Sequence, residues 1–241
     1  MKERRKETKI QWIGISVIVF LLTVLISAPI AFQTPVLAEH STTENGVTAT
    51  PPKVAPQNEE IAKRNALRAQ FAQSGSTLKP ELISDALLQQ ATRIDVSTPL
   101  DFRASLAVSY YAKLLELRPS LILAVIEHES GFRQNASNSH QARGYMQILP
   151  VAERGALKAY GNFLGISYNP KRIFEPEYNI GIGSACLGGF LYGYKDEHHA
   201  LSAYNRGGGG IQKYYRNTGT YVTGYSKVVL QLEKKYQALN P

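Results

Sequence analysis

The sequence has 241 residues, of which 44% are hydrophobic, and a formal net charge of +8. This composition excludes a disordered chain and allows one good-sized domain plus extensions. Its single cysteine, Cys186, excludes an intramolecular disulfide, and we expect it to pack as a small apolar side chain in a helix. The positive charge suits an anionic surface such as a cell-wall polymer. No RNP-like, zinc-finger or basic-region pattern is present, so we expect no nucleic-acid partner.

Residues 1–38 predict a signal peptide or an N-terminal membrane anchor. Residues 1–9 hold five basic and two acidic side chains, a net charge of +3, and no charged residue follows before Glu39. The uncharged run ends in "VLA" at Ala38, where signal peptidase could cleave. Taken over residues 10–32 the apolar stretch reaches spanning length, so an uncleaved anchor in the inner membrane is the alternative. Either reading places the rest of the chain in the cell envelope, periplasmic or otherwise outside the cytoplasm.

The next 60 or so residues predict a spacer followed by accessory helices. Residues 39–57 are rich in Thr and Pro and poor in large apolar side chains, which is typical of a flexible linker. Within residues 58–98, the segment 58–74 has a helix-forming composition, and the segment 80–95 starts with a Pro-Glu pair and carries an apolar stripe. The sequence assigns these helices no function.

Residues 99–241 predict an all-α domain. Phe102, Leu106, Tyr110 and Leu114 recur at helical spacing, and a helix over residues 119–130 begins with a proline and precedes a glycine that can end it. No period-2 strand series and no internal repeat is visible in the sequence. Further helices are expected at about 150–160, 177–193, 196–204, 209–216 and 221–238.

The helix over residues 119–130 is apolar nearly all round until it reaches Glu127, His128 and Glu129. Because successive residues turn by about 100°, Glu127 and Glu129 lie on opposite sides and cannot form a carboxylate pair. Phe132 occupies the second histidine position of an H-E-x-x-H motif, so we expect no metal and no cofactor. Glu129 lies in the last turn, where the helix dipole and partial burial raise a carboxyl pKa, as a general acid requires. An ordinary solvated glutamate is the alternative at this point.

Two later segments, "ARGYMQILP" and "LSAYNRGGGG", place polar and aromatic groups beside glycine turns. Met146 and Ile148 of the first segment are predicted core residues. The neighbouring tyrosine ring and amide groups offer the stacking surface, donors and acceptors that a sugar-binding groove needs. The alternative for the Tyr-Asn pair is a helix end running into a glycine-rich loop. The groove candidates are Gln147, Tyr204 and Asn205.

Together these segments resemble the catalytic domain of lytic transglycosylases of the soluble-lytic-transglycosylase (SLT) type. That family shares its fold with goose-type lysozyme, so the resemblance implies a lysozyme-like helical domain. It covers about residues 106–236 and rests on four motifs in the family's order. The motifs are "RPSLILAVIEHESGF", "SNSHQARGYMQILP", "NIGIGSACLGGFL" and "LSAYNRGGGGI".

The resemblance also implies roles for single residues. Glu129 matches the catalytic acid/base, and Ser130 matches a serine that helps to hold the sugar or the carboxyl. Two tyrosines could match the one that contacts the catalytic carboxyl, and Tyr225 fits better than Tyr221, because "YSKVVL" needs no gap. The other substrate-binding residues that it implies are Gly144, Tyr145, Met146, Gln147, Tyr204 and Asn205.

Four positions depart from the family pattern. Tyr145 replaces the usual leucine, and Arg206 replaces the small residue that usually follows the Tyr-Asn pair. Cys186 replaces the usual tyrosine, and Gln141 replaces the usual glycine. These departures bear on subsite preference and leave the reaction class unchanged.

The implied substrate is the glycan strand of peptidoglycan. Ordinary glycosidases need two carboxylates, whereas here only Glu129 has motif support. The resemblance implies that Glu129 protonates the oxygen between MurNAc and GlcNAc, then takes the proton of the MurNAc C6 hydroxyl as that oxygen closes on C1. A lysozyme-like hydrolase and a non-catalytic wall-binding component of an envelope-spanning assembly are the alternatives. The sequence leaves open general wall turnover and local wall opening for a secretion or conjugation apparatus.

Overall fold

The computed structural model describes residues 66, 69, 77–194 and 196–241. The predicted signal or anchor segment, the linker and nearly all of the first accessory helix lie outside the described residues. The chain divides by its contacts into Met1–Pro51 and Pro52–Pro241, and every described residue belongs to the second unit.

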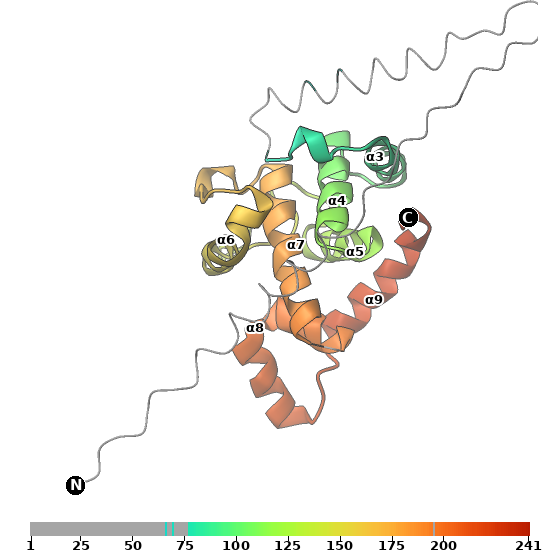
Figure 1. The fold of residues 1–241 in the computed structure, drawn as a ribbon. Helices are drawn as coiled ribbons and strands as arrows, with labels where there is room; N and C mark the ends of the chain where they lie inside the picture. Colours follow the sequence, from blue (N-terminus) through green and yellow to red (C-terminus); the bar gives the residue numbers. More distant parts are fainter. Residues whose placement is uncertain (1–65, 67–68, 70–76, 195) are drawn as a thin grey trace, which may run out of the picture. The chain divides into compact units, whose positions relative to one another are not determined.

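The described residues form seven α-helices and no named strand, which confirms the predicted all-α class (Figure 1). Two isolated β-bridges join Ser137 to Arg143 and Arg143 to Ile148 within one loop. Three short 3-10 helices are also present, η1 (Pro80–Leu82), η2 (Pro170–Arg172) and η3 (Gln237–Leu239). The α-helices are α3 (Asp85–Ser97), α4 (Phe102–Leu114), α5 (Pro119–Ser130), α6 (Pro150–Leu164), α7 (Pro176–Gly193), α8 (Glu197–Thr218) and α9 (Gly224–Tyr236).

Two helix boundaries differ from the sequence prediction. The segment expected to be helical from residue 80 makes the turn η1 first, and α3 starts after Ser84, whose hydroxyl accepts a hydrogen bond from the Leu87 amide. The two helices expected at 196–204 and 209–216 are the halves of α8, which bends at Gly207 (φ 70°, ψ 160°). Only glycine adopts such a backbone conformation readily, so the bend requires it.

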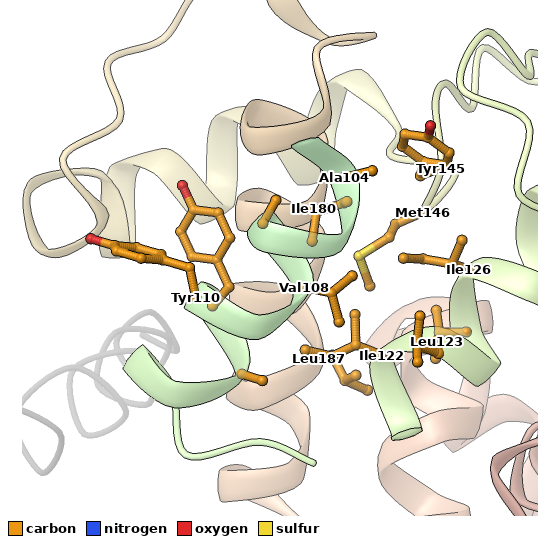
Figure 2. Close-up of a cluster of buried hydrophobic side chains, with 14 of the residues drawn as sticks. Ala104, Val108, Tyr110, Ile122, Leu123, Ile126, Tyr145, Met146, Ile180 and Leu187 are labelled. Atoms are coloured by element: carbon orange, nitrogen blue, oxygen red, sulfur yellow. The ribbon is translucent and has the colours of Figure 1, made fainter. Parts of the chain in front are cut away.

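Helix α5 lies in the core, as its apolar sequence predicts. The side chains from Leu121 to Ile126 are all at most 1% exposed. Figure 2 shows Ile122, Leu123 and Ile126 in a cluster with side chains from α4, α7 and the loop before α6. A helix buried on every side cannot shift without repacking its neighbours, so it is a rigid base for the polar residues at its end.

No helix in the described ranges is long and apolar enough to cross a bilayer. The apolar stretch of residues 10–32 lies outside those ranges, so the anchor prediction stays a prediction.

Helix α9 is tied to the start of α5 by a buried carboxylate. Glu233 is 5% exposed and accepts hydrogen bonds from Arg118 Nε at 2.6 Å and Ser120 Oγ at 2.9 Å. A second nitrogen of Arg118 donates to Glu197 at 2.7 Å, at the start of α8. Arg118 therefore joins three helices at one point.

Removal of the Glu233 carboxylate should leave Arg118 and Ser120 without their shared partner. We expect Glu233→Ala to lower the free energy of unfolding by about 2 kcal/mol, because a buried charge-assisted network is broken. Lys234→Ala, at the exposed neighbouring position, should change it by less than about 0.5 kcal/mol. Urea denaturation followed by circular dichroism measures both, and equal effects of the two variants would contradict the role of Glu233.

Candidate active site

Glu129 and Tyr225 meet where the end of α5 faces the start of α9. The Tyr225 hydroxyl donates a hydrogen bond of 2.8 Å to Oε1 of Glu129. Gly131, with φ 57°, ends α5 just after Glu129, as the sequence predicts. The Glu129 side chain is half-buried, and burial raises the pKa of its carboxyl, although the Tyr225 hydrogen bond acts to lower it. A carboxyl held in this way can keep its proton at a higher pH than a solvated one.

Glu127 lies on the opposite side of α5, as predicted. It accepts hydrogen bonds of 2.7 Å from Lys235 Nζ and from the Tyr236 hydroxyl. Burial acts to raise the pKa of Glu127, but these two hydrogen bonds lower it on balance. Glu127 thus stays ionised and fastens α9, while Glu129 is the carboxyl with the raised pKa.

His128, between the two glutamates, contacts the site from its edge. Its ring meets the Tyr225 ring at a centroid distance of 4.6 Å and an interplanar angle of 65°. Burial lowers the pKa of His128, so the ring is neutral near pH 7 and packs against Tyr225 as an aromatic group.

Tyr204 closes the site from α8. Its hydroxyl donates a hydrogen bond of 3.0 Å to the backbone oxygen of Met146. Burial, followed by the charge of Glu129, raises the pKa of Tyr204 well above its usual value. The same causes raise the pKa of Tyr225. Both phenols are therefore neutral donors, and they supply aromatic surface close to Glu129.

The loop before α6 is held by Asn179 of α7, which is fully buried. Its amide oxygen accepts from the Met146 backbone N–H at 2.9 Å, and its amide nitrogen donates to the backbone oxygens of Arg143 and Ile173, each at 2.9 Å. Gly144 has φ 76°, and a Cβ at this position would overlap the Asn179 amide. The glycine is required for both its backbone angle and the close approach.

Gln147 orders the outer part of the same loop. Its side-chain nitrogen donates to the backbone oxygens of Ala136 (3.1 Å) and Gly144 (3.0 Å), and its oxygen accepts from Asn138 at 3.2 Å. Its φ of 48° is unusual for a residue with a side chain. Gln147 therefore uses both ends of its amide within the loop.

Several predicted site residues have buried side chains in this structure. Met146 is fully buried and points into the core cluster near Ile126 (Figure 2). The Ser130 hydroxyl donates to the Ile126 backbone oxygen at 3.0 Å. Tyr145 is 4% exposed, and burial raises its pKa to about 12. Asn205, by contrast, is exposed. Their substrate-binding roles stay predictions, and for Met146 the group nearest the site is the backbone oxygen that Tyr204 binds.

Tyr221, the other tyrosine considered for the catalytic carboxyl, lies in a ring stack with His199 and Tyr215. Cys186 packs against the core as predicted, and burial raises the pKa of its thiol to about 11.

Four further carboxylates that lack motif support have partners of their own. Glu153, fully buried beneath the loop, accepts from Arg143 at 2.9 Å and from the Tyr178 hydroxyl at 2.8 Å. The others are Glu177 with Arg103, Glu175 with Arg172, and Asp196, which caps the start of α8. Within the described ranges no group of three or more His, Cys, Asp or Glu is placed to hold a metal ion.

Sequence reasoning missed Asn179 and Glu153 as supports of the site. Asn179 begins the motif "NIGIGS", and a polar residue at the start of an apolar glycine-rich helix was the signal available. Glu153 offered no comparable signal. Its partners lie 10 positions earlier (Arg143) and 25 positions later (Tyr178), and no sequence pattern links them to it.

Comparison with known proteins agrees with this geometry. The model of the family described as "Transglycosylase SLT domain" matches residues 107–224. This match spans just under half of the chain and includes Glu129, Gln147 and Tyr204.

Curated relatives carry a related name. Membrane-bound lytic murein transglycosylase C of Yersinia pestis (strain Pestoides F) is 30% identical over 44% of this chain and 31% of its own length. The protein of the same name from Serratia proteamaculans (strain 568) is 30% identical over 54% of this chain and 39% of its own length. The chain thus matches less than half the length of these relatives.

Solved structures of similar proteins include two lytic transglycosylases. The 70 kDa soluble lytic transglycosylase of Escherichia coli is 20% identical, with a TM-score of 0.46 over 75% of this chain and 34% of its own. An inactive glutamate-to-glutamine mutant of lytic transglycosylase Slt from Pseudomonas aeruginosa is 19% identical, with a TM-score of 0.45 over 76% of this chain and 32% of its own.

The loop geometry predicts opposite effects for two glycine substitutions. Gly144→Ala should lower the free energy of unfolding by about 3 kcal/mol, because the added Cβ meets Asn179 at a positive φ. Gly155→Ala, in α6 with nothing within 4 Å of the added Cβ, should raise it by about 0.5–1 kcal/mol. Urea denaturation measures both, and a mild effect at Gly144 would contradict the close approach to Asn179.

The pKa directions at Glu129 and Glu127 predict opposite pH dependences of stability. A carboxyl whose pKa is higher in the folded than in the unfolded chain lowers the free energy of unfolding as the pH rises through the interval between these two pKa values. Glu129→Gln should therefore match the wild type below about pH 4 and be more stable near pH 7. Glu127 has a lowered pKa, so Glu127→Gln should be less stable than the wild type near pH 7, with the difference vanishing on acidification. Unfolding free energies at both pH values test the signs.

Proposed function

We propose that the domain is a peptidoglycan lytic transglycosylase in which Glu129 acts as both general acid and general base. The observation that carries the proposal is the half-buried Glu129 carboxyl of raised pKa, which is hydrogen-bonded to Tyr225 and lies near Tyr204. The match of residues 107–224 to the transglycosylase SLT domain supports it. So does the name of the curated relatives, lytic murein transglycosylase.

In the first half of the reaction, protonated Glu129 donates its proton to the glycosidic oxygen between MurNAc and GlcNAc. The bond from MurNAc C1 to that oxygen breaks, and GlcNAc leaves with a new hydroxyl. The Tyr225 hydroxyl, 2.8 Å from Oε1, then stabilises the carboxylate that forms. Burial favours the protonated form beforehand, so the acid is available near neutral pH.

In the second half, the Glu129 carboxylate accepts the proton of the MurNAc C6 hydroxyl while that oxygen bonds to C1. The product is a 1,6-anhydro sugar, Glu129 regains its proton, and no water is consumed. A retaining or inverting glycosidase would need a second carboxylate close to the first. Among the described residues, Glu127 faces away, and Glu153, Glu175 and Glu177 are each paired with an arginine.

The substrate in this proposal is the glycan strand of peptidoglycan, and the location is the cell envelope. Residues 10–32 would carry the export signal or the inner-membrane anchor. Wall opening at a secretion or conjugation apparatus is the narrower role that the sequence left open beside general turnover, and the same chemistry would serve both.

Digestion of purified sacculi by the full-length chain tests the reaction. We expect 1,6-anhydro muropeptides by mass spectrometry and no incorporation of oxygen from water labelled with a heavy isotope. Glu129→Gln should lower the rate by about 10²–10⁴-fold, the usual contribution of a general acid. Glu81→Gln removes the same charge from an exposed glutamate in η1 and should leave the rate unchanged.

Three results would overturn parts of the proposal. Reducing-end products that carry the heavy isotope would identify a lysozyme-like hydrolase. Undiminished cleavage by Glu129→Gln would show that another residue is the acid. Binding of sacculi without cleavage by the wild-type chain would indicate a wall-binding component instead.

A further inference from the structure

We infer that His198 and His199, on the first turn of α8, are positioning residues that hold the segment 221–226 so that the Tyr225 hydroxyl meets Glu129. The inference rests on the proposed function, since it assigns a role in the same reaction. Neither histidine touches Glu129 through a hydrogen bond, and both act through the segment that carries Tyr225.

His199 fixes the start of this segment by stacking. Its ring lies between Tyr194, at a centroid distance of 3.7 Å, and Tyr221, at 3.5 Å and an interplanar angle of 7°. The other face of Tyr221 stacks on Tyr215 at 4.3 Å, and Phe190 extends the column beyond Tyr194. Tyr221 therefore has a ring on each face, which defines its position more closely than one contact would.

His198 fixes the far end of the segment by a hydrogen bond. Its Nδ1 lies 2.9 Å from the hydroxyl oxygen of Ser226. Ser226 is fully buried and forms a reciprocal capping box with Thr223 at the start of α9. The two histidines thus hold Tyr221 and Ser226, and Tyr225 lies between these points in the chain.

A buried hydroxyl chain joins the two points. Thr223 Oγ1 and Ser202 Oγ are 2.8 Å apart, and the Ser202 hydroxyl donates to the Tyr221 backbone oxygen at 2.8 Å. If the Thr223 hydroxyl donates to Ser202, each hydroxyl proton in this row has one acceptor. Thr223 Oγ1 still accepts from the Ser226 amide at 3.2 Å. The segment 221–226 is therefore anchored to α8, in addition to the contacts that Tyr225 makes with His128 and Glu129 of α5.

The histidines supplement the contacts that Tyr225 makes with His128 and Glu129 of α5, because the flanking parts of α8 and α9 restrain the segment weakly or from a distance. The half of α8 that carries Tyr215 follows the bend at Gly207 and three more glycines, and glycine is the weakest helix former after proline. At the other end of α9, Glu233 and Lys235 bind α5 more than two turns away from Tyr225. A hydrogen bond weakens steeply when its geometry is lost, so the contact of Tyr225 with Glu129 depends on the nearer anchors.

The charge state of His199 suits a stacking role. Burial lowers its pKa and Asp196, which caps the same helix, acts to raise it. The other groups against it are the rings of Tyr194 and Tyr221. Its buried Nε2 has no hydrogen-bond partner within the described ranges, so a proton there would be uncompensated. His199 is a neutral flat ring at the pH where Glu129 works.

The test is the pH profile of sacculus cleavage by full-length variants. Tyr225→Phe removes the hydrogen bond that lowers the pKa of Glu129, so the fall in activity at high pH should move to higher pH. His199→Ala should move it in the same direction and lower the rate by about tenfold, because Tyr225 loses its alignment. In the double variant, His199→Ala should add no further shift, since the hydroxyl that it positions is already absent.

Three controls separate positioning from general stability. His199→Phe keeps a stacking ring and should keep the wild-type profile. His198→Ala should shift the pH profile as His199→Ala does. Ile94→Ala in α3 should lower the melting temperature and leave the pH profile unchanged. If His199→Ala does not fold, Tyr221→Leu removes the same stack from the other side and should give the same shift.

An unmoved profile in His199→Ala, or an equal shift in the Tyr225→Phe background, would overturn the inference. If Glu129→Gln is inactive in the same assay, the proposed function stands even when either of these results overturns the role of the histidines. Activity in Glu129→Gln would instead remove the proposed function itself.

Discussion

The position of α9 along α5 is the constraint on which the candidate site depends. Helix α5 is apolar on every side until its last turn, so the core determines where Glu129 lies. Helix α9 approaches from a distant part of the sequence, and its hydrogen bond from Tyr225 reaches a carboxylate 96 positions earlier. Glu127, on the opposite side of α5, binds Lys235 of α9, and Glu233 of α9 binds Arg118 at the opposite end of α5. Glu129 and its partner Tyr225 are thus held by contacts that take no part in the proposed chemistry.

The same arrangement explains why two glutamates two positions apart differ in protonation. Glu127 faces an ammonium group and a phenol at 2.7 Å, which stabilise its charge. Glu129 faces the apolar and phenolic side, where burial outweighs its single hydrogen bond. Because the helix turns by about 200° between them, one short segment can supply a structural anion and a proton donor. Burial of α5 is therefore a condition of the chemistry as well as of the fold.

The sequence predicts most of the helices because apolar spacing, prolines and glycines are local signals. It places the ends of α5 at Pro119 and Gly131, and it places Glu127 and Glu129 on opposite sides. It is wrong about the start of α3, where the turn η1 and the Ser84 cap compete with the Pro-Glu pair at residue 80. The contact between Tyr225 and Glu129 is non-local, and the family pattern, more than periodicity, pointed to it.

The support of the loop before α6 shows why the rest could not be predicted. Met146 was expected both in the core and in the groove, and the two expectations concern different atoms: its side chain is buried, and its backbone oxygen binds Tyr204. The backbone is held in place by Asn179, whose three hydrogen bonds reach Met146, Arg143 and Ile173. The amino-acid type at a position does not show whether its backbone or its side chain contributes to a site. Substitutions at Met146 should therefore report on core packing first, whereas substitutions at Asn179 or Tyr204 remove the hydrogen bonds that hold or contact its backbone.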